Sequence, residues 1–129
     1  MTKSGSEHLQ SLRDGRSVYL NGGLVNDVTE HSAFCNAVNS VCKLYDFAMA
    51  PENRSLMTFE TEDGNIANRM WQLPRSYDEL VERRLAIETW SSQHAGFFGR
   101  SPDHVASCLS GMFMGLEKFK AYDSERATA

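Results

Sequence analysis

Apolar residues recur every three or four positions along three long stretches of the chain, which predicts three amphipathic helices. The first stretch begins at His31 and ends at Met49, because Pro51 follows and the residue before a proline resists the helical conformation. We expect one face of this helix to pack into a core. The apolar positions of that face are Phe34, Ala37, Val38, Val41, Leu44, Tyr45 and Ala48.

The second long helix is predicted to begin at Tyr77. Ser76 and Glu79 have the S-x-x-E spacing of a capping box. The helix is expected to extend to about Ala95, where Gly96 is a natural stop. The positions expected to face inward are Leu80, Arg84, Ile87, Trp90 and His94.

The third helix is predicted from Pro102 through Phe119. Its apolar stripe is expected to be core and contains Val105, Leu109, Met112, Phe113 and Leu116. The sequence GMFMG in this stretch is better explained by packing than by cofactor binding. In the second helix, the charged run 82–84 is typical of a solvated face.

Shorter elements complete the predicted fold. A short helix is expected over residues 6–13, and β-prone residues on both sides of 21–23 predict a hairpin because Asn-Gly favours tight turns. A second extended pair, 55–61 and 65–73, flanks another turn at 62–65. The fold class is therefore mainly α with two small β-hairpins, in a single domain of residues 1–129.

Composition narrows the functional classes. The net charge of -4 argues against nucleic acid or an anionic membrane as the main partner, since both need a dense cationic surface. No apolar run is long enough for a transmembrane helix, and the polar start does not resemble a signal peptide. Three cysteines do not predict a disulfide framework, and Cys35 and Cys42 are expected to be core residues. We expect a cytoplasmic location.

The most distinctive chemistry lies just before the third helix, at Arg100. Ser101 suits the N-cap, Pro102 the first helical position, and Asp103 complements the helix dipole. The positive charge of Arg100, in contrast, lies beside the positive end of that dipole, which is unfavourable. Its guanidinium either reaches a carboxylate or a helix C-terminus, or it binds an anion together with the free N–H groups of the helix.

His104 lies one helical turn beyond Arg100. It is either an ordinary surface or core histidine, or a hydrogen-bond donor or proton carrier at the same site. The other histidines, His8, His31 and His94, lack the spacing of a metal site. The chain also has no glycine-rich phosphate loop.

Five segments in order resemble one family. They are LRDGRSVYLNG, DVTEHSAFCNAV with SVCKLYDFA, LMTFETEDG, LPRSYDELVERR and FGRSPDHVASCLSGM. Together they resemble the N-terminal domain of the oxygenase components of 4-hydroxyphenylacetate 3-monooxygenases. Related phenol hydroxylases dependent on reduced FAD and the 4-hydroxybutyryl-CoA dehydratases belong to the same family. The resemblance covers residues 6–120, and G-R-S-P-D is its most specific block.

The resemblance implies a helical N-terminal domain of acyl-CoA dehydrogenase-like type, without the middle β-barrel and the C-terminal helix bundle that forms a tetramer. In the hydroxylase branch, a separate reductase supplies reduced FAD, and a phenol is hydroxylated beside its existing hydroxyl. The arginine of G-R-S-P-D lines the phenol pocket there and corresponds to Arg100. His104 stands where the hydroxylases often carry tyrosine. The dehydratase branch uses cysteine ligands for an iron–sulfur cluster, and near Arg100 this chain has none before Cys108.

By resemblance, the chain is the N-terminal part of a two-component monooxygenase and is inactive alone. Its implied partners are a phenolic substrate, a flavin reductase and, in the full-length protein, three further copies in a homotetramer. FAD is expected to be held mostly by the missing domains. The alternative is a non-catalytic helical remnant or interaction domain. A large exposed apolar patch would favour a domain cut from a larger protein.

Overall fold

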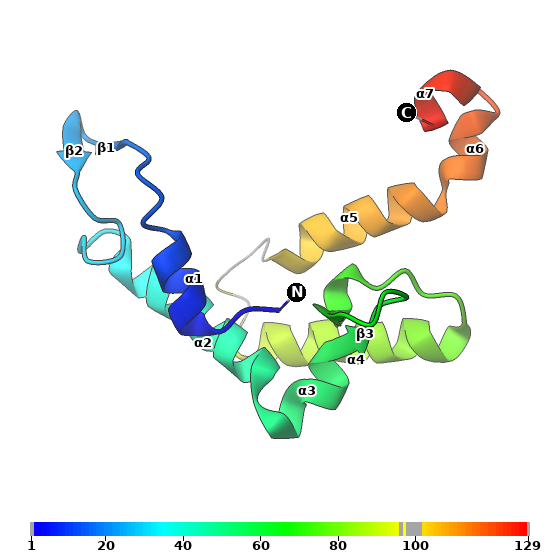
Figure 1. The fold of residues 1–129 in the computed structure, drawn as a ribbon, viewed down its shortest axis with the longest axis horizontal. Coiled ribbons are helices and arrows are strands. Elements are labelled where there is room, and N and C mark those ends of the chain that lie inside the picture. The colour runs from blue at the N-terminus through cyan, green and yellow to red at the C-terminus, as the bar shows by residue number, and fades with distance from the viewer. Residues whose placement is uncertain (1, 96, 98–101, 129) are drawn as a thin grey trace. The chain divides into compact units, whose positions relative to one another are not determined.

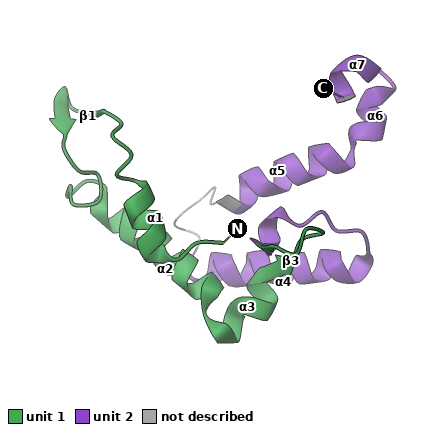
Figure 2. Ribbon diagram, viewed as in Figure 1, with its two compact units in different colours: residues 1–66 green, residues 67–129 purple. Residues whose placement is uncertain are grey.

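The computed structural model describes residues 2–95, 97 and 102–128, and for Pro102 and Thr128 it describes the backbone alone. The chain divides into two compact units, residues 1–66 and 67–129 (Figure 2). Helices predominate, and the strands form two separate two-stranded sheets. The predicted fold class, mainly α with two small strand pairs, is confirmed. No helix in the described parts of the chain is long and apolar enough to cross a membrane.

The first unit is built on the packing of α1 (Gly5–Ser11) against α2 (Cys35–Met49) (Figure 1). The helices lie close together at Gly5, whose N–H donates a 2.8 Å hydrogen bond to Asp46 Oδ1. A Cβ atom at Gly5 would lie 2.5 Å from the backbone oxygen of Cys42. Farther along, the His8 ring lies on Tyr45, with ring centroids 4.8 Å apart. The absence of a side chain at Gly5 therefore sets the distance between the two helices.

Both helices begin at different residues from those predicted. The capping box of α1 consists of Ser4 and Glu7: the Ser4 hydroxyl accepts from the Glu7 N–H, and the Glu7 carboxylate accepts from the Ser4 N–H. Because of this capping pair, α1 begins at Gly5 and not at residue 6 as predicted. α2 begins four residues later than expected because residues 27–34 form turns, in which the Asp27 carboxylate accepts from both the N–H and the hydroxyl of Thr29.

The first hairpin agrees with its prediction. Strands β1 (Val18–Leu20) and β2 (Gly23–Val25) pair antiparallel, with Tyr19 opposite Leu24. Asn21 and Gly22 have φ values of 51° and 80°. Positive φ at both central residues matches the right-handed twist of the flanking strands, which is why Asn-Gly makes this turn.

The prediction of an extended segment over residues 55–61 is partly wrong. Pro51 ends α2, but it also occupies the first position of another helix, α3 (Pro51–Met57). A proline at that position costs no hydrogen bond, because the first N–H groups of a helix have no partner within it. Only the end of the segment is extended, as strand β3 (Thr58–Glu60), which pairs with β4 (Ile66–Asn68).

The second unit continues from β4 into the short 3-10 helix η1 (Arg69–Trp71) and then into helices α4 to α7. Helix α4 (Tyr77–Ser92) and helix α5 (Pro102–Met114) both pack against η1, and α6 (Leu116–Lys120) and α7 (Ser124–Thr128) follow (Figure 1). The predicted single helix from Pro102 to Phe119 is thus broken at Gly115. The buried core of this unit contains Met70, Ala86, Trp90 and Ala106.

The predicted inner face of α4 is displaced by one residue. Arg83 is buried, whereas Arg84 is exposed and Leu80 is 50% exposed. Trp90 is buried as predicted, and α4 ends at Ser92 rather than Ala95. The predicted stop, Gly96, lies outside the described residues. Arg83 faces inward in place of Arg84 and donates to the backbone oxygen of Met70 in η1.

The first prediction concerns Gly5. Replacing Gly5 by alanine is expected to destabilise the chain by about 1–3 kcal/mol, because the new methyl group would overlap backbone of α2. Gly111 is the matched control: it lies inside a helix, and a Cβ there would meet nothing within 4 Å. Gly111→Ala is expected to stabilise by up to about 1 kcal/mol. Urea unfolding measures both, and equal effects would contradict the close approach.

The second prediction concerns pH. Burial lowers the pKa of His8, helped by the positive charge of Lys3, and His8 Nδ1 is buried with no hydrogen-bond partner among the described residues. The folded chain therefore favours neutral His8. That stability is complete above the unfolded pKa of about 6.5 and is lost as the pH falls through the lower folded pKa.

Thermal unfolding between pH 8 and pH 5 tests this expectation. His8→Phe keeps a ring against Tyr45 but cannot titrate, so its stability should change less over this range than that of the wild-type chain. A His8→Phe curve parallel to the wild-type curve would rule out His8 as the source.

Candidate functional site at the start of helix α5

Helix α5 begins at Pro102 with Asp103 in its first turn, as predicted. Arg100 and Ser101, the proposed anion-binding cation and N-cap, lie outside the described residues. The described part of the candidate site is therefore the first two turns of α5 together with the residues that hold them.

His104 is exposed on α5, so it is not a core histidine. Its Nε2 atom lies 3.9 Å from Sγ of Cys108, one helical turn later. A ring in this position can donate or accept a hydrogen bond with a ligand.

Arg83 is the residue that anchors this region. Its Nη2 and Nε atoms both donate to the backbone oxygen of Met70, at 2.7 and 3.2 Å, and Nη2 also donates to Ser107 Oγ at 3.0 Å. One side chain of α4 therefore bonds both η1 and α5. The sequence pattern missed this role because Arg83 stands in a charged run that is typical of a solvated surface.

The charge of Arg83 is balanced by the first turn of α5. Burial lowers the pKa of the Arg83 guanidinium, and the negative charge of Asp103 acts in the opposite direction. Arginine remains cationic at neutral pH under such conditions. Asp103, predicted from the helix dipole alone, therefore also complements a buried cation.

A second arginine holds η1 to α4. Arg69 is buried, and its Nη1 atom donates to Gln72 Oε1 at 3.0 Å and to Glu82 Oε2 at 2.7 Å. Glu82 and Arg83 are thus both directed to η1, whereas Arg84 forms an exposed pair with Glu88 at 2.6 Å. Glu82 and Arg84 are exposed, as the charged run predicts, and only Arg83 is buried.

The first unit contains a different polar feature, a cavity of about 330 Å³ beside two arginines. Arg13 pairs with Asp27 at 2.9 Å, and Arg16 pairs with Asp14. Arg16 is also the main reason why the pKa of Asp14 falls to about 2. Carboxylates therefore neutralise the charge of both guanidinium groups beside this cavity. Among the described residues, no group of three or more histidine, cysteine or acidic side chains is placed to hold a metal ion.

Comparison with known proteins places the whole chain in one family. Residues 4–129 match the family model for the N-terminal part of 4-hydroxyphenylacetate 3-hydroxylase. The chain belongs to the 4-hydroxyphenylacetate 3-hydroxylase family. The resemblance of the five segments is therefore confirmed.

Three curated relatives are similar over most of the chain. The 4-nitrophenol 2-monooxygenase oxygenase component of a Rhodococcus species is 40% identical over 92% of this chain and 23% of its own length. The 4-hydroxyphenylacetate 3-monooxygenase oxygenase components of Pseudomonas aeruginosa and Escherichia coli are 42% and 40% identical, over 84% and 81% of this chain and 21% and 20% of theirs. The chain therefore spans about a quarter or less of the length of these relatives.

Solved structures agree with this assignment. The oxygenase component of 4-hydroxyphenylacetate 3-monooxygenase complexed with FAD superposes with a TM-score of 0.82 and 27% identity, over 91% of this chain and 25% of that one. An archaeal 4-hydroxybutyryl-CoA dehydratase has a TM-score of 0.75 at 21% identity, over 96% of this chain and 24% of that one, which shows a shared fold. The predicted acyl-CoA dehydrogenase-like type of N-terminal domain is confirmed.

The third prediction tests the role of Arg83. Arg83→Ala is expected to destabilise the chain by about 2–3 kcal/mol, because it leaves the buried Met70 carbonyl without its donor and removes the hydrogen bond to the half-buried Ser107 hydroxyl. Arg84→Ala is the neighbouring control and should cost less than about 1 kcal/mol, since its pair with Glu88 is exposed. Equal losses in urea unfolding would show that Arg83 does not anchor the unit.

Proposed function

We propose that residues 1–129 are the N-terminal domain of a two-component monooxygenase that hydroxylates a phenolic substrate beside its existing hydroxyl group. The observation that carries this proposal is the match of almost the whole chain to the N-terminal part of oxygenase components. The names of those relatives refer to 4-hydroxyphenylacetate and 4-nitrophenol, which are both phenols. The shared chemical group is therefore the aromatic hydroxyl.

Arg100 is proposed to bind the phenolic oxygen, with His104 as a second polar contact. Ser101, Pro102 and Asp103 provide the helix N-terminus at the site. A cationic guanidinium beside a helix N-terminus stabilises negative charge on an oxygen, both in a phenolate and as charge develops during attack on the ring. The ring of His104 is exposed and lies in the first turn of α5.

Arg83 is proposed to support this site indirectly. Its bond to Ser107 holds the second turn of α5, and its charge complements Asp103 in the first turn. These contacts hold the first two turns of α5 against η1. Arg83 is therefore a positioning residue in this proposal.

The proposed cofactor is reduced FAD from a separate reductase. When bound, it supplies the activated oxygen that is transferred to the ring. The described residues of this chain do not fit FAD: the cavity beside Arg13 and Arg16 has both cations neutralised by carboxylates, which leaves them unsuited to a diphosphate. We therefore assign FAD binding mainly to the part of the oxygenase beyond this chain, where we also place the contacts of a homotetramer.

The fourth prediction uses a chimera in which this chain replaces the N-terminal quarter of the Escherichia coli oxygenase component, its 40% identical relative. With the reductase and reduced flavin present, Arg100→Ala should lower kcat/KM for 4-hydroxyphenylacetate about 100-fold, because one charge-stabilising donor is lost. The melting temperature should stay close to that of the parent chimera. Arg100→Lys should be intermediate, since it keeps the charge and loses the fork of donors.

The control for this experiment is Arg84→Ala, which removes an exposed arginine elsewhere in the same unit. It should leave kcat/KM unchanged. Undiminished turnover in the Arg100→Ala chimera would contradict the assignment of Arg100. Detection of the natural polypeptide with an antibody to residues 76–110 complements the assay, since the proposal expects a mass several times the 14.5 kDa of this chain.

A further inference from the structure

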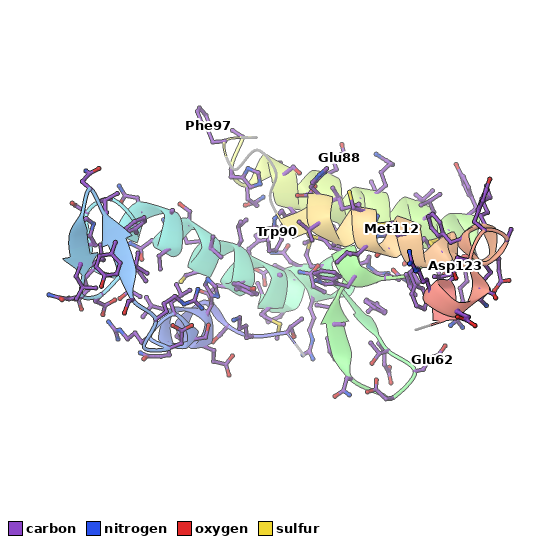
Figure 3. All side chains as sticks on the ribbon, turned by 90° about the horizontal axis from the view of Figure 1, so that it is seen from above. Glu62, Glu88, Trp90, Phe97, Met112 and Asp123 are labelled. Atoms are coloured by element: carbon purple, nitrogen blue, oxygen red, sulfur yellow. The ribbon has the colours of Figure 1, made fainter. Side chains whose placement is uncertain are left out.

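Helix α5 turns its large apolar side chains away from the rest of its unit. Val105, Leu109, Met112 and Phe113, here termed the α5 apolar face, are between 52% and 59% exposed. Met112 is labelled on this helix in Figure 3. The pattern of these residues predicts a core stripe, and the structure shows that prediction to be wrong for this chain. A contiguous exposed stripe of this kind marks an interaction site.

The opposite side of α5 carries small residues and makes the contacts with η1 and α4. Ala106 is fully buried, Ser110 is 7% exposed, and Ser107 accepts the hydrogen bond from Arg83. Because this side is fixed by a directional bond to a buried arginine, α5 cannot rotate to bury its apolar face without breaking that bond. The exposure of the face is therefore a consequence of how the unit packs.

We infer that the α5 apolar face docks against the remaining part of an oxygenase chain of this family. This inference rests on the proposed function. Relatives are about four times as long as the matched segment, which is their N-terminal part. The face lies in the last third of that segment, so about three quarters of each relative's chain follows soon after it in sequence.

Covalent connection favours this occupant over a second copy. A segment that follows within the same chain meets the face at a high effective concentration, whereas a second copy depends on the protein concentration. The α5 apolar face contains no charged residue, and interfaces that stay covered permanently are more apolar than transient ones. A domain that is always attached to the rest of its chain can keep such a face without aggregating.

Cys108 provides a direct probe of this inference. It is exposed and lies three residues after Val105 and four before Met112, so its thiol flanks the α5 apolar face. Its alkylation by iodoacetamide can be followed by mass spectrometry of the Cys108 peptide. We expect alkylation to be about tenfold slower or more in the Escherichia coli chimera than in the free 129-residue chain, because reaction then requires the docked face to open.

A matched pair of substitutions tests the specificity of the face. Met112→Glu and Leu24→Glu place the same charge at positions that are 58% and 57% exposed. Both free chains should keep the wild-type circular dichroism spectrum, since neither side chain is buried. In the chimera, Met112→Glu should restore most of the Cys108 reactivity, and Leu24→Glu should leave Cys108 protected.

Three results would overturn the inference. The first is a failure of docking. It would appear as equal alkylation of Cys108 in the free chain and the chimera, or as aggregation of the chimera because the α5 apolar face does not fit the rest of the oxygenase. The second is equal loss of protection in both glutamate variants. The third is a discrete dimer of the free chain that Met112→Glu converts to monomer, which would assign the face to a second copy.

The readout is independent of turnover, so the two proposals can fail separately. A chimera that protects Cys108 but hydroxylates no phenol would leave the docking face in place and contradict the proposed function. A chimera that hydroxylates the substrate while Cys108 remains as reactive as in the free chain would support the proposed function and contradict the docking of the α5 apolar face.

Discussion

The buried guanidinium of Arg83 is the interaction on which the second unit depends. It gives two hydrogen bonds to one carbonyl of η1 and one to a hydroxyl of α5, and so joins η1, α4 and α5. Few apolar side chains are available to hold these segments together, since the buried core of the unit is small. A planar group with several donors suits the task because it satisfies a buried carbonyl and still carries the charge that Asp103 complements.

Local signals in the sequence were sufficient to predict most of the helices and strands. The Asn-Gly turn, the Ser76 cap and the proline at the start of α5 each depend on residues within a few positions, and each has the predicted place. The start of α1 was missed although its cap, Ser4 with Glu7, is equally local. The family could also be predicted, because five short segments occur in the expected order.

Burial was harder to predict, because it depends on partners that are distant in sequence. Arg83 and Arg84 are adjacent and chemically identical, yet only Arg83 lies opposite the Met70 carbonyl. The stripe on α5 has the spacing of a core face, but the helix is held by the other side, through Ser107 and Ala106. Apolar periodicity predicts that one face of a helix packs against other residues. It does not show whether those residues belong to the same segment of the chain.

Helix α5 thus carries two constraints on opposite sides. Substitutions on the side of Ala106 and Ser107 act on whether the unit folds, whereas in the proposed docking those on the side of Leu109 and Met112 act on what the folded unit joins. The two sets of positions can therefore change independently during evolution. A lineage that alters the larger part of the oxygenase can adjust the apolar side of one helix to match it, and the fold of the N-terminal segment is unaffected.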